Sequence, residues 1–286
     1  PLSLHDALPI STVEILPVAS NWNASSTVQF VSFHDEERHP EGWGSGMVVK
    51  IGSRRFLLTA LHVALLRPGV MLKPHPSLGM EIEKISNWYF FTDKPRTNDG
   101  KDAHPVLDFA FIEISDSVDL YRYNVASSPD KPQAWKIREF DIANASPLVV
   151  GERCSFCGII HPQDVSNCHL KVDEIGSVGV DFRVVENVTY DKLEGRIAHF
   201  MLPSDFSKTG ISLKGTSGSP ILNSNKEPVA IVIGGSERDG IVDGIMFSDI
   251  KDFLLGKTGI CYDLNSFCQN AEVEACMLRF FYPEST

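Results

Sequence analysis

Short runs of apolar and β-branched residues, each ended by turn-forming residues, dominate this chain. Runs of this kind are typical of β-strands, and many of them spaced by about 8–12 residues predict a β-sandwich or β-barrel. They fall into two groups, separated by a stretch at 126–147 that contains Pro, Ser and Asp. The expected strands are 27–33, 46–51, 55–58, 88–92, 109–114, 148–150, 178–185, 196–202, 220–222, 229–234 and 241–247. The pattern predicts an all-β protein.

The last expected strand leads into a short segment with helical spacing of its apolar positions. This segment, residues 248–256, has Ser248 as its expected N-cap and Gly256 as its terminating residue. Residues 257–286 form an extension to which the sequence assigns no role.

The beginning of the chain does not look like part of a fold. Residues 2–10 resemble the translation of a sequencing adapter, and no initiator Met precedes them. We therefore exclude residues 1–10 from fold reasoning and expect the true N-terminus to be missing. The expected domain organisation is residues 11–125, a linker at 126–147, and residues 148–256 with the short helix.

A glycine-flanked serine, Ser217, stands in the hexapeptide Gly-Thr-Ser-Gly-Ser-Pro, within an otherwise apolar region. Flanking glycines allow a tight turn that presents the hydroxyl and aims neighbouring N–H groups at one point. A serine hydroxyl is a weak nucleophile until a base takes its proton. A histidine, His62, ends an upstream apolar run, and a single acid, Asp108, begins another strand-like run. The chain therefore contains a candidate nucleophile, base and acid.

In the order His, Asp, Ser, these segments resemble the trypsin/chymotrypsin-like serine peptidases, most closely the bacterial and viral members. The resemblance covers roughly residues 25–255 and implies two antiparallel Greek-key β-barrels of six strands each. It implies that Ser217 is the nucleophile, His62 the general base, and Asp108 the group that orients the imidazole. Backbone N–H groups of Gly215 and Ser217 would form the oxyanion hole. The implied function is a serine endopeptidase that acts on protein or peptide substrates without a cofactor.

Each of these residues has an ordinary structural explanation when it is taken alone. A serine between glycines is commonly a turn residue, a histidine after an apolar run is commonly a core residue, and Asp108 could simply start a strand. All three explanations would have to hold together by coincidence. Asp102 is a rival for the acid, but it stands in a polar turn, whereas the apolar run after Asp108 places that residue at a strand end.

The expected substrate pocket carries no charge. Members of the family that select Lys or Arg have an Asp six residues before the nucleophile, where this chain has Ile211. Glutamyl endopeptidases have a His on the strand behind the pocket, and residues 229–235 contain none. We therefore expect selection for an apolar or small side chain, with the pocket walls left open by two of the glycines, Gly235 and Gly244. The expected pocket residues are Ile211, Ile233, Gly234, Gly235 and Gly244.

Thr216 precedes the candidate nucleophile. Zymogen-type members of the family carry an Asp at this position, which pairs with a newly cleaved N-terminus. Threonine has no charge for such a pair, so we expect the site to form without N-terminal processing.

The charge of the chain narrows the classes of partner. A net charge of −11, from 26 basic and 37 acidic residues, argues against general binding to nucleic acids or anionic membranes, because both need a basic face. No apolar run approaches ~18 residues, so the sequence predicts no membrane span.

The six cysteines form two clusters, Cys154, Cys157 and Cys168, then Cys261, Cys268 and Cys276. The positions at which secreted animal members place disulfides hold Val63 and residues 212–214, which favours a reducing, cytoplasmic compartment. The first cluster and His169 could be interpreted as zinc ligands. Their spacing is poor and no further ligand pair follows, so free or buried thiols are the better interpretation and no metal is expected.

Two rival functions stay open at this level. An inactive barrel could serve as a binding or scaffold module, because a sequence does not show whether the site is blocked. A processing protease active on one cleavage sequence is the narrower alternative. The extension at 257–286 and the long segment at 67–105 could provide such selectivity.

Overall fold

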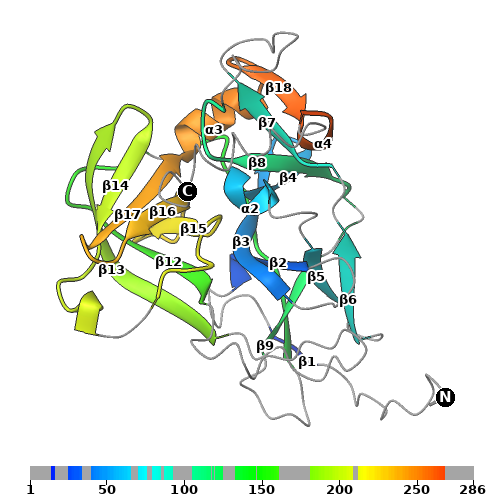
Figure 1. The fold of residues 1–286 in the computed structure, drawn as a ribbon, viewed down its shortest axis with the longest axis horizontal. Helices are drawn as coiled ribbons and strands as arrows, with labels where there is room; N and C mark the ends of the chain where they lie inside the picture. Colours follow the sequence, from blue (N-terminus) through cyan, green and yellow to red (C-terminus); the bar gives the residue numbers. More distant parts are fainter. Residues whose placement is uncertain are drawn as a thin grey trace.

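The computed structural model consists mostly of β-strands, which confirms the all-β prediction (Figure 1). It describes residues 14–16, 25–33, 40–65, 70–75, 79–84, 87–92, 105–116, 118, 120–124, 133–145, 147–160, 181–208 and 212–267. Six strands close into an antiparallel barrel in the order β12-β13-β14-β17-β16-β15. Their bounds are β12 Arg153–Ile160, β13 Asp181–Glu194, β14 Ile197–Met201, β15 Pro220–Asn223, β16 Pro228–Ser236 and β17 Ile241–Met246.

Alternation of side chains along the strands fills this barrel. On β14, Ala198 and Phe200 are fully buried, whereas the residues on either side of each are more exposed. Phe156 of β12 and Val242 of β17 are also fully buried and join the same hydrophobic cluster. The sheet therefore closes around a packed interior.

The first half of the chain forms a nine-stranded sheet, with the order β18-β7-β8-β4-β3-β2-β5-β6 and with β11 paired to β3. It is larger than the expected six-stranded barrel, and β11 from the predicted linker and β18 from the predicted extension both belong to it. The bounds are β2 Val28–Phe33, β3 Pro40–Ile51, β4 Arg54–Thr59, β5 Val70–His75, β6 Gly79–Lys84, β7 Tyr89–Thr92, β8 Ala110–Ile114, β11 Glu139–Asp141 and β18 Ile260–Asp263. A separate small sheet contains β1 Glu14–Leu16, β10 Gln133–Lys136 and β9 Tyr121–Asn124.

The helices whose bounds lie within the described residues are short. They are α2 Leu61–Leu65, the 3₁₀ turn η4 Phe206–Lys208, α3 Phe247–Leu254 and α4 Leu264–Phe267. No helix among the described residues has the length and apolar character needed to cross a membrane.

The predicted N-cap of the helix after the barrel is wrong. The helix α3 begins at Phe247, one residue before Ser248, and Met246 occupies the N-cap position without a side-chain hydrogen bond. Phe247 is fully buried, so packing of this ring determines where the helix begins. Gly256 follows the helix with a φ of +70°, and its N–H donates to the carbonyl of Phe253 at 2.8 Å.

The predicted strand at 148–150 is also wrong, because these residues do not pair with any strand in the described part of the chain. Val149 and Val150 are 70% and 67% exposed, and only Leu148 packs against the barrel core. The barrel instead begins with β12, whose pattern includes two cysteines and a glycine and gave no clear strand signal.

The extension returns to the first half of the molecule. β18 pairs antiparallel with β7, from Ile260 opposite Thr92 to Asp263 opposite Tyr89. α4 then buries Leu264 and Phe267 in the hydrophobic cluster of the large sheet. In Figure 1 these elements lie beside β7. Residues 260–267 therefore have a structural role that the sequence did not reveal.

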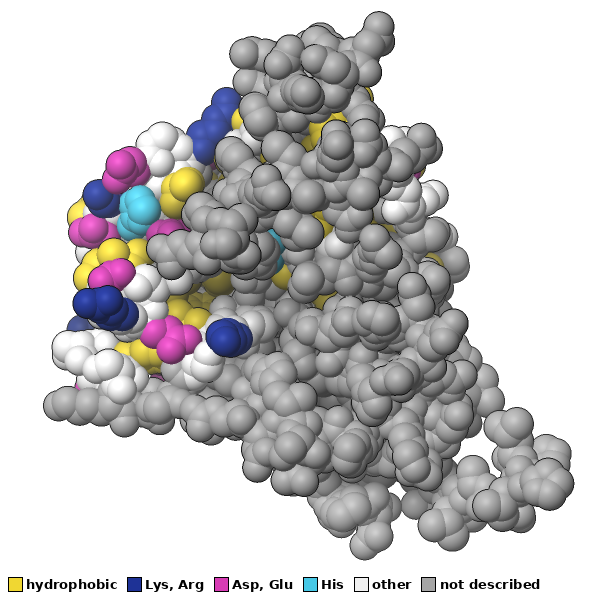
Figure 2. Space-filling view, viewed as in Figure 1, with side chains coloured by type: hydrophobic (Ala, Val, Ile, Leu, Met, Phe, Trp, Pro, Cys, Tyr) yellow, Lys and Arg dark blue, Asp and Glu magenta, His cyan; other side chains and the backbone are white. Residues whose placement is uncertain are grey.

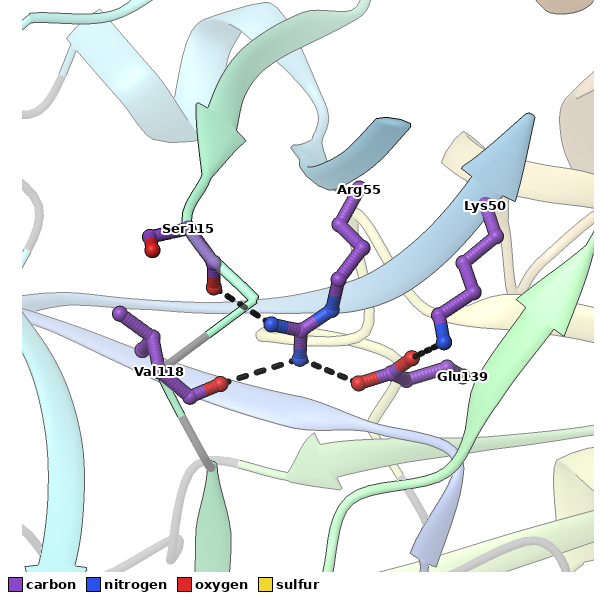
Figure 3. Close-up of polar contacts among 5 residues, drawn as sticks. All are labelled: Lys50, Arg55, Ser115, Val118 and Glu139. Carbon is purple, nitrogen blue, oxygen red and sulfur yellow. Dashed lines mark hydrogen bonds and ion pairs between the residues drawn. The ribbon is translucent and has the colours of Figure 1, made fainter. Parts of the chain in front are cut away.

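A buried arginine connects the sheet to the segment that leads into the second half. Arg55 of β4 is 4% exposed and donates to the carbonyls of Ser115 at 2.5 Å and Val118 at 3.0 Å. Its guanidinium also binds the carboxylate of Glu139 on β11. The same carboxylate forms a second ion pair, with Lys50, at 2.7 Å (Figure 3). Burial alone would raise the pKa of Glu139, but hydrogen bonds from Lys50 and Arg55 lower it below its ordinary value.

Candidate active site

The side chains of His62 and Asp108 are in direct contact. His62 lies in α2, directly after β4, and Asp108 lies two residues before β8. The ring nitrogen Nδ1 of His62 is 2.7 Å from Oδ2 of Asp108, and the main-chain N–H of His62 donates to Oδ1 at 3.0 Å. Both side chains are 10% exposed. Because an ionised carboxylate only accepts hydrogen bonds, this contact places the imidazole proton on Nδ1 and leaves Nε2 as an acceptor.

The local sequence explains why these two residues meet. β4 and β8 pair antiparallel, with Thr59 opposite Ala110, so the segment after β4 and the segment before β8 lie at the same end of the pair. Leu107 and Phe109 are buried on either side of Asp108, which fixes the backbone that carries the carboxylate. The pairing register therefore positions the histidine and the acid.

Ser217 lies in a tight turn between η4 and β15. Gly215 has a φ of +87° and Gly218 a φ of +91°, a backbone region that glycine adopts without the strain of a Cβ. Within the turn, the N–H of Thr216 donates to the carbonyl of Leu213 at 3.1 Å, and the N–H of Ser219 donates to the carbonyl of Thr216 at 2.9 Å. The turn is thus held by its own backbone hydrogen bonds.

The turn docks against the strand pair that leads to His62. Ser45 of β3 donates its N–H to the carbonyl of Ser217 at 2.8 Å, and its hydroxyl donates to the carbonyl of Gly215 at 2.7 Å. A Cβ on Gly218 would overlap the carbonyl oxygen of Ser45. Thr59, three residues before His62, donates its hydroxyl to that same carbonyl at 2.7 Å. The serine turn and the histidine segment therefore share one anchoring residue.

The hydroxyl of Ser217 makes no hydrogen bond to any described residue, His62 included. The backbone N–H groups of Gly215 and Ser217 likewise donate to no other described group. Of the three residues singled out by the sequence, the structure joins His62 and Asp108 by hydrogen bonds and places Ser217 on a turn anchored to Ser45 of β3. Asp102 lies outside the described residues.

No family model and no curated protein matches this chain. Solved structures with a similar fold include the MamO protease domain of Magnetospirillum magneticum, with 14% identity, coverage of 81% of this chain and 97% of that chain, and a TM-score of 0.43. A serine endoprotease of Yersinia pestis has 13% identity, coverage of 84% and 67%, and a TM-score of 0.42. The Rv3671c protease of M. tuberculosis, in its active form, has 12% identity, coverage of 89% and 92%, and a TM-score of 0.45. All three are proteases. At these identities the likeness concerns the fold alone.

The expected pocket residues lie on β16, β17 and an undescribed segment. Gly234 has open space where a Cβ would stand, and Ile233 is half-buried against the hydrophobic cluster that both halves share. Gly244 faces the barrel interior, where Phe200 and Ile221 fill the space beside it, so it does not leave a wall open as the sequence suggested. Gly235 is exposed, and a Cβ there would meet the carbonyl of Ile241 at 2.5 Å. Ile211 lies outside the described residues.

Thr216 is held by uncharged contacts. Its side chain is buried, and its hydroxyl donates to the carbonyl of Leu213 at 2.7 Å. A Cβ on Gly158 of β12 would overlap the methyl group of Thr216, so these two backbones approach closely. A neutral hydrogen bond and packing therefore occupy the position at which the zymogen-type resemblance implies an ion pair.

A second histidine–carboxylate pair lies on the outer face of the barrel. Nδ1 of His199 is 2.7 Å from Oδ1 of Asp243, the same separation as in the pair at His62. His199 stands on β14 between residues that face the core, and Glu194 is 3.7 Å from its Nε2. Figure 2 shows acidic, basic and hydrophobic side chains interspersed over the coloured part of the face in view. Unlike the segment around Ser217, the paired residues of β14 and β17 include no glycine-flanked serine.

No group of three or more potential metal ligands occurs among the described residues. Cys154 and Cys157 are buried on β12 and form no disulfide, while Cys168 and His169 lie outside the described residues. Burial, with a smaller effect of Glu152, raises the pKa of Cys154 to about 12.

Proposed function

We propose that the chain is a serine endopeptidase in which Ser217, His62 and Asp108 form the catalytic triad. One observation supports this proposal most directly: Asp108 binds both the ring and the main-chain N–H of His62. This contact gives the imidazole the tautomer that a general base needs. The turn that carries Ser217 is anchored on Ser45, which also accepts a hydrogen bond from Thr59, three residues before His62. The turn offers a nucleophile with two N–H groups that donate to no other described group.

In the proposed reaction, Oγ of Ser217 attacks the scissile carbonyl carbon and its proton passes to Nε2 of His62. Gly215 and Ser217 donate their N–H groups to the resulting oxyanion, where one such donor typically contributes ~3 kcal/mol. The C–N bond then breaks as His62 returns the proton to the leaving amine, and an acyl-enzyme remains. Water attacks this ester and His62 accepts the proton of the water. As the acyl C–O bond breaks, His62 passes that proton to Oγ of Ser217, and the acid product leaves with Ser217 and His62 regenerated.

The missing hydrogen bond between Ser217 and His62 is compatible with this mechanism, because such bonds often shorten only when substrate is bound. It is also the observation that favours a second candidate function. A barrel whose serine never pairs with its histidine would be a binding or scaffold module rather than an enzyme.

We propose a small or apolar side chain at the cleavage position. Residues 229–235 contain no ionisable group, Ile211 is uncharged, and Gly234 has open space beside it. A peptide library should show small or apolar preference, and tight selection for Arg, Lys or Glu would contradict this.

We further propose that the site needs no N-terminal cleavage, because Thr216 is held by the carbonyl of Leu213 and by packing on Gly158. If only a proteolytically trimmed form reacted in the labelling experiment that follows, this proposal would be wrong.

Labelling with a fluorophosphonate probe tests the proposed enzyme. The wild type should be labelled on Ser217, Ser217→Ala should not be labelled, and His62→Ala should react at least about 100-fold more slowly, in line with the usual contribution of a general base. His199→Ala is the matched control, because it removes an imidazole with the same Nδ1–carboxylate separation. It should react like the wild type. A folded wild-type protein that is not labelled would leave the binding module as the better function.

A further inference from the structure

Ser45 is a fully buried polar residue in the middle of β3. It uses three groups at once: its N–H binds the carbonyl of Ser217, its hydroxyl binds the carbonyl of Gly215, and its carbonyl accepts from Thr59. The first two partners belong to the serine turn of the barrel, whereas Thr59 belongs to the strand that leads to His62. Ser45 thus joins the two halves of the molecule at the candidate site.

The hydroxyl of Ser45 fixes one particular peptide group. The peptide between Gly215 and Thr216 has its carbonyl held by Ser45 at 2.7 Å and its N–H held by the carbonyl of Leu213 at 3.1 Å. Holding both ends of this peptide restrains rotation about the Cα–C bond of Gly215 and the N–Cα bond of Thr216. The peptides on either side of it carry the N–H groups of Gly215 and Ser217, so its orientation helps to set the directions in which they point.

The strand that carries Ser45 is itself fixed against the histidine segment. A Cβ on Gly44 would overlap the side chain of Val63, which follows His62 in α2, so β3 and α2 approach closely. A shift of β3 would therefore move the turn and the histidine together. The contacts of Ser45 hold the distance between them.

From these contacts we propose that Ser45 is a positioning residue, whose hydroxyl holds the N–H groups of Gly215 and Ser217 in the orientation that an oxyanion hole needs. The proposal rests on the proposed function above. It differs from a purely structural role, because a donor that acts only on a developing oxyanion changes the rate of reaction and not the binding of the reagent.

Thr27 offers a matched control. It is as fully buried as Ser45, and its hydroxyl also donates between the halves, to the carbonyl of Cys157 at 2.7 Å. Its partner lies outside the turn at 215–218. Removing either hydroxyl leaves one buried carbonyl without its partner, so Ser45→Ala and Thr27→Val should lose similar thermal stability.

The experiment measures labelling by a fluorophosphonate at several probe concentrations, which separates kinact from KI. Ser45→Ala should lower kinact about tenfold, as expected for one lost hydrogen bond, with KI within about twofold of wild type. Thr27→Val should change neither. The pH midpoint of kinact should be equal in the wild type and Ser45→Ala, because the contact between His62 and Asp108 is untouched. Ser45→Gly is the second variant. Like Ser45→Ala it removes the hydroxyl and keeps the backbone donor, so its kinact and KI should equal those of Ser45→Ala.

The two proposals fail in different ways. A wild type that is not labelled would overturn the proposed function and the role of Ser45 with it. A wild type that is labelled, with both Ser45 variants reacting like Thr27→Val, would overturn the role of Ser45 alone. A shifted pH midpoint in Ser45→Ala would also overturn it, because the hydroxyl would then act through His62.

Discussion

Cys154 illustrates how burial decides the chemistry of a single residue. Its spacing from Cys157 suggests a metal ligand, but β12 turns Cys154 into the hydrophobic core of the barrel. A thiol there is 4% exposed, and burial raises its pKa to about 12. Since the thiolate is the reactive and metal-binding form, this environment disfavours both properties.

We predict that Cys154 resists alkylation in the folded protein. With a pKa of about 12, only about one molecule in ten thousand carries the thiolate at pH 8. Iodoacetamide labelling followed by peptide mass spectrometry should show modification of Cys154 only after unfolding in urea. Cys261 is exposed and serves as the internal comparison, which should be modified first. Equal rates at the two thiols in the folded protein would contradict the prediction.

At the level of elements, β18 forms one edge of the large sheet, and α4 follows it directly in the chain. The N–H of Leu264 donates to the carbonyl of Trp88 at 2.8 Å. The Phe267 ring packs edge-on against Phe90, with ring centroids 4.9 Å apart. β7 in turn accepts the N–H of Val106 at the carbonyl of Phe91, in the segment that leads to Asp108. The extension therefore supports the strand on which that segment rests.

Phe267→Ala should lower the free energy of unfolding by about 3 kcal/mol, because it leaves a cavity next to Phe90. Urea denaturation followed by circular dichroism measures this change. Asn265→Ala, in the same helix but exposed, should cost no more than about 0.5 kcal/mol. Equal effects of the two substitutions would mean that α4 does not pack as described.

At the level of the whole molecule, the two halves share one hydrophobic cluster. Met47 and Phe56 of the sheet pack in the same cluster as Ile231 and Ile245 of the barrel and Phe253 of α3. The ion pairs of Arg55 with Glu139 fix β11, which leads from one half to the other. The two halves are thus held together by packing, hydrogen bonds and one charge network around the buried Arg55.

The charge network predicts a loss of stability in acid. The pKa of Glu139 is lowered from 4.5 in the folded state, so its contribution is complete above about pH 4.5 and is lost as the pH falls through the folded-state value. Glu139→Gln should therefore destabilise the protein at pH 7, by about 2 kcal/mol, and much less at pH 3. Thermal denaturation at the two pH values measures the difference.

Glu113→Gln is the control for this prediction. Glu113 pairs with Arg54, and both side chains are 51% exposed, so its removal should change stability by less than about 1 kcal/mol at pH 7. A difference between wild type and Glu139→Gln that persisted unchanged at pH 3 would contradict the prediction.

Local patterns in the amino-acid sequence were enough to establish the class of the fold and the candidate chemistry. Alternating apolar positions specify strands because a pleated strand places successive side chains on opposite faces. The glycines beside Ser217 specify a tight turn because few other residues tolerate a positive φ. His62 could be singled out because it follows an apolar run, and Asp108 because it directly precedes one.

Contacts between groups far apart in the sequence follow from tertiary packing. The hydroxyl of Ser45 reaches Gly215 across 170 residues, and β18 pairs with β7 from the far end of the chain. Neither contact leaves a local pattern, because a serine in a strand or a short apolar run after a helix looks the same with or without such a partner. Likewise, Phe247 overrides the local preference for Ser248 as N-cap, because burial of a ring outweighs one capping hydrogen bond. Long-range burial is the physical information that a local sequence pattern does not carry.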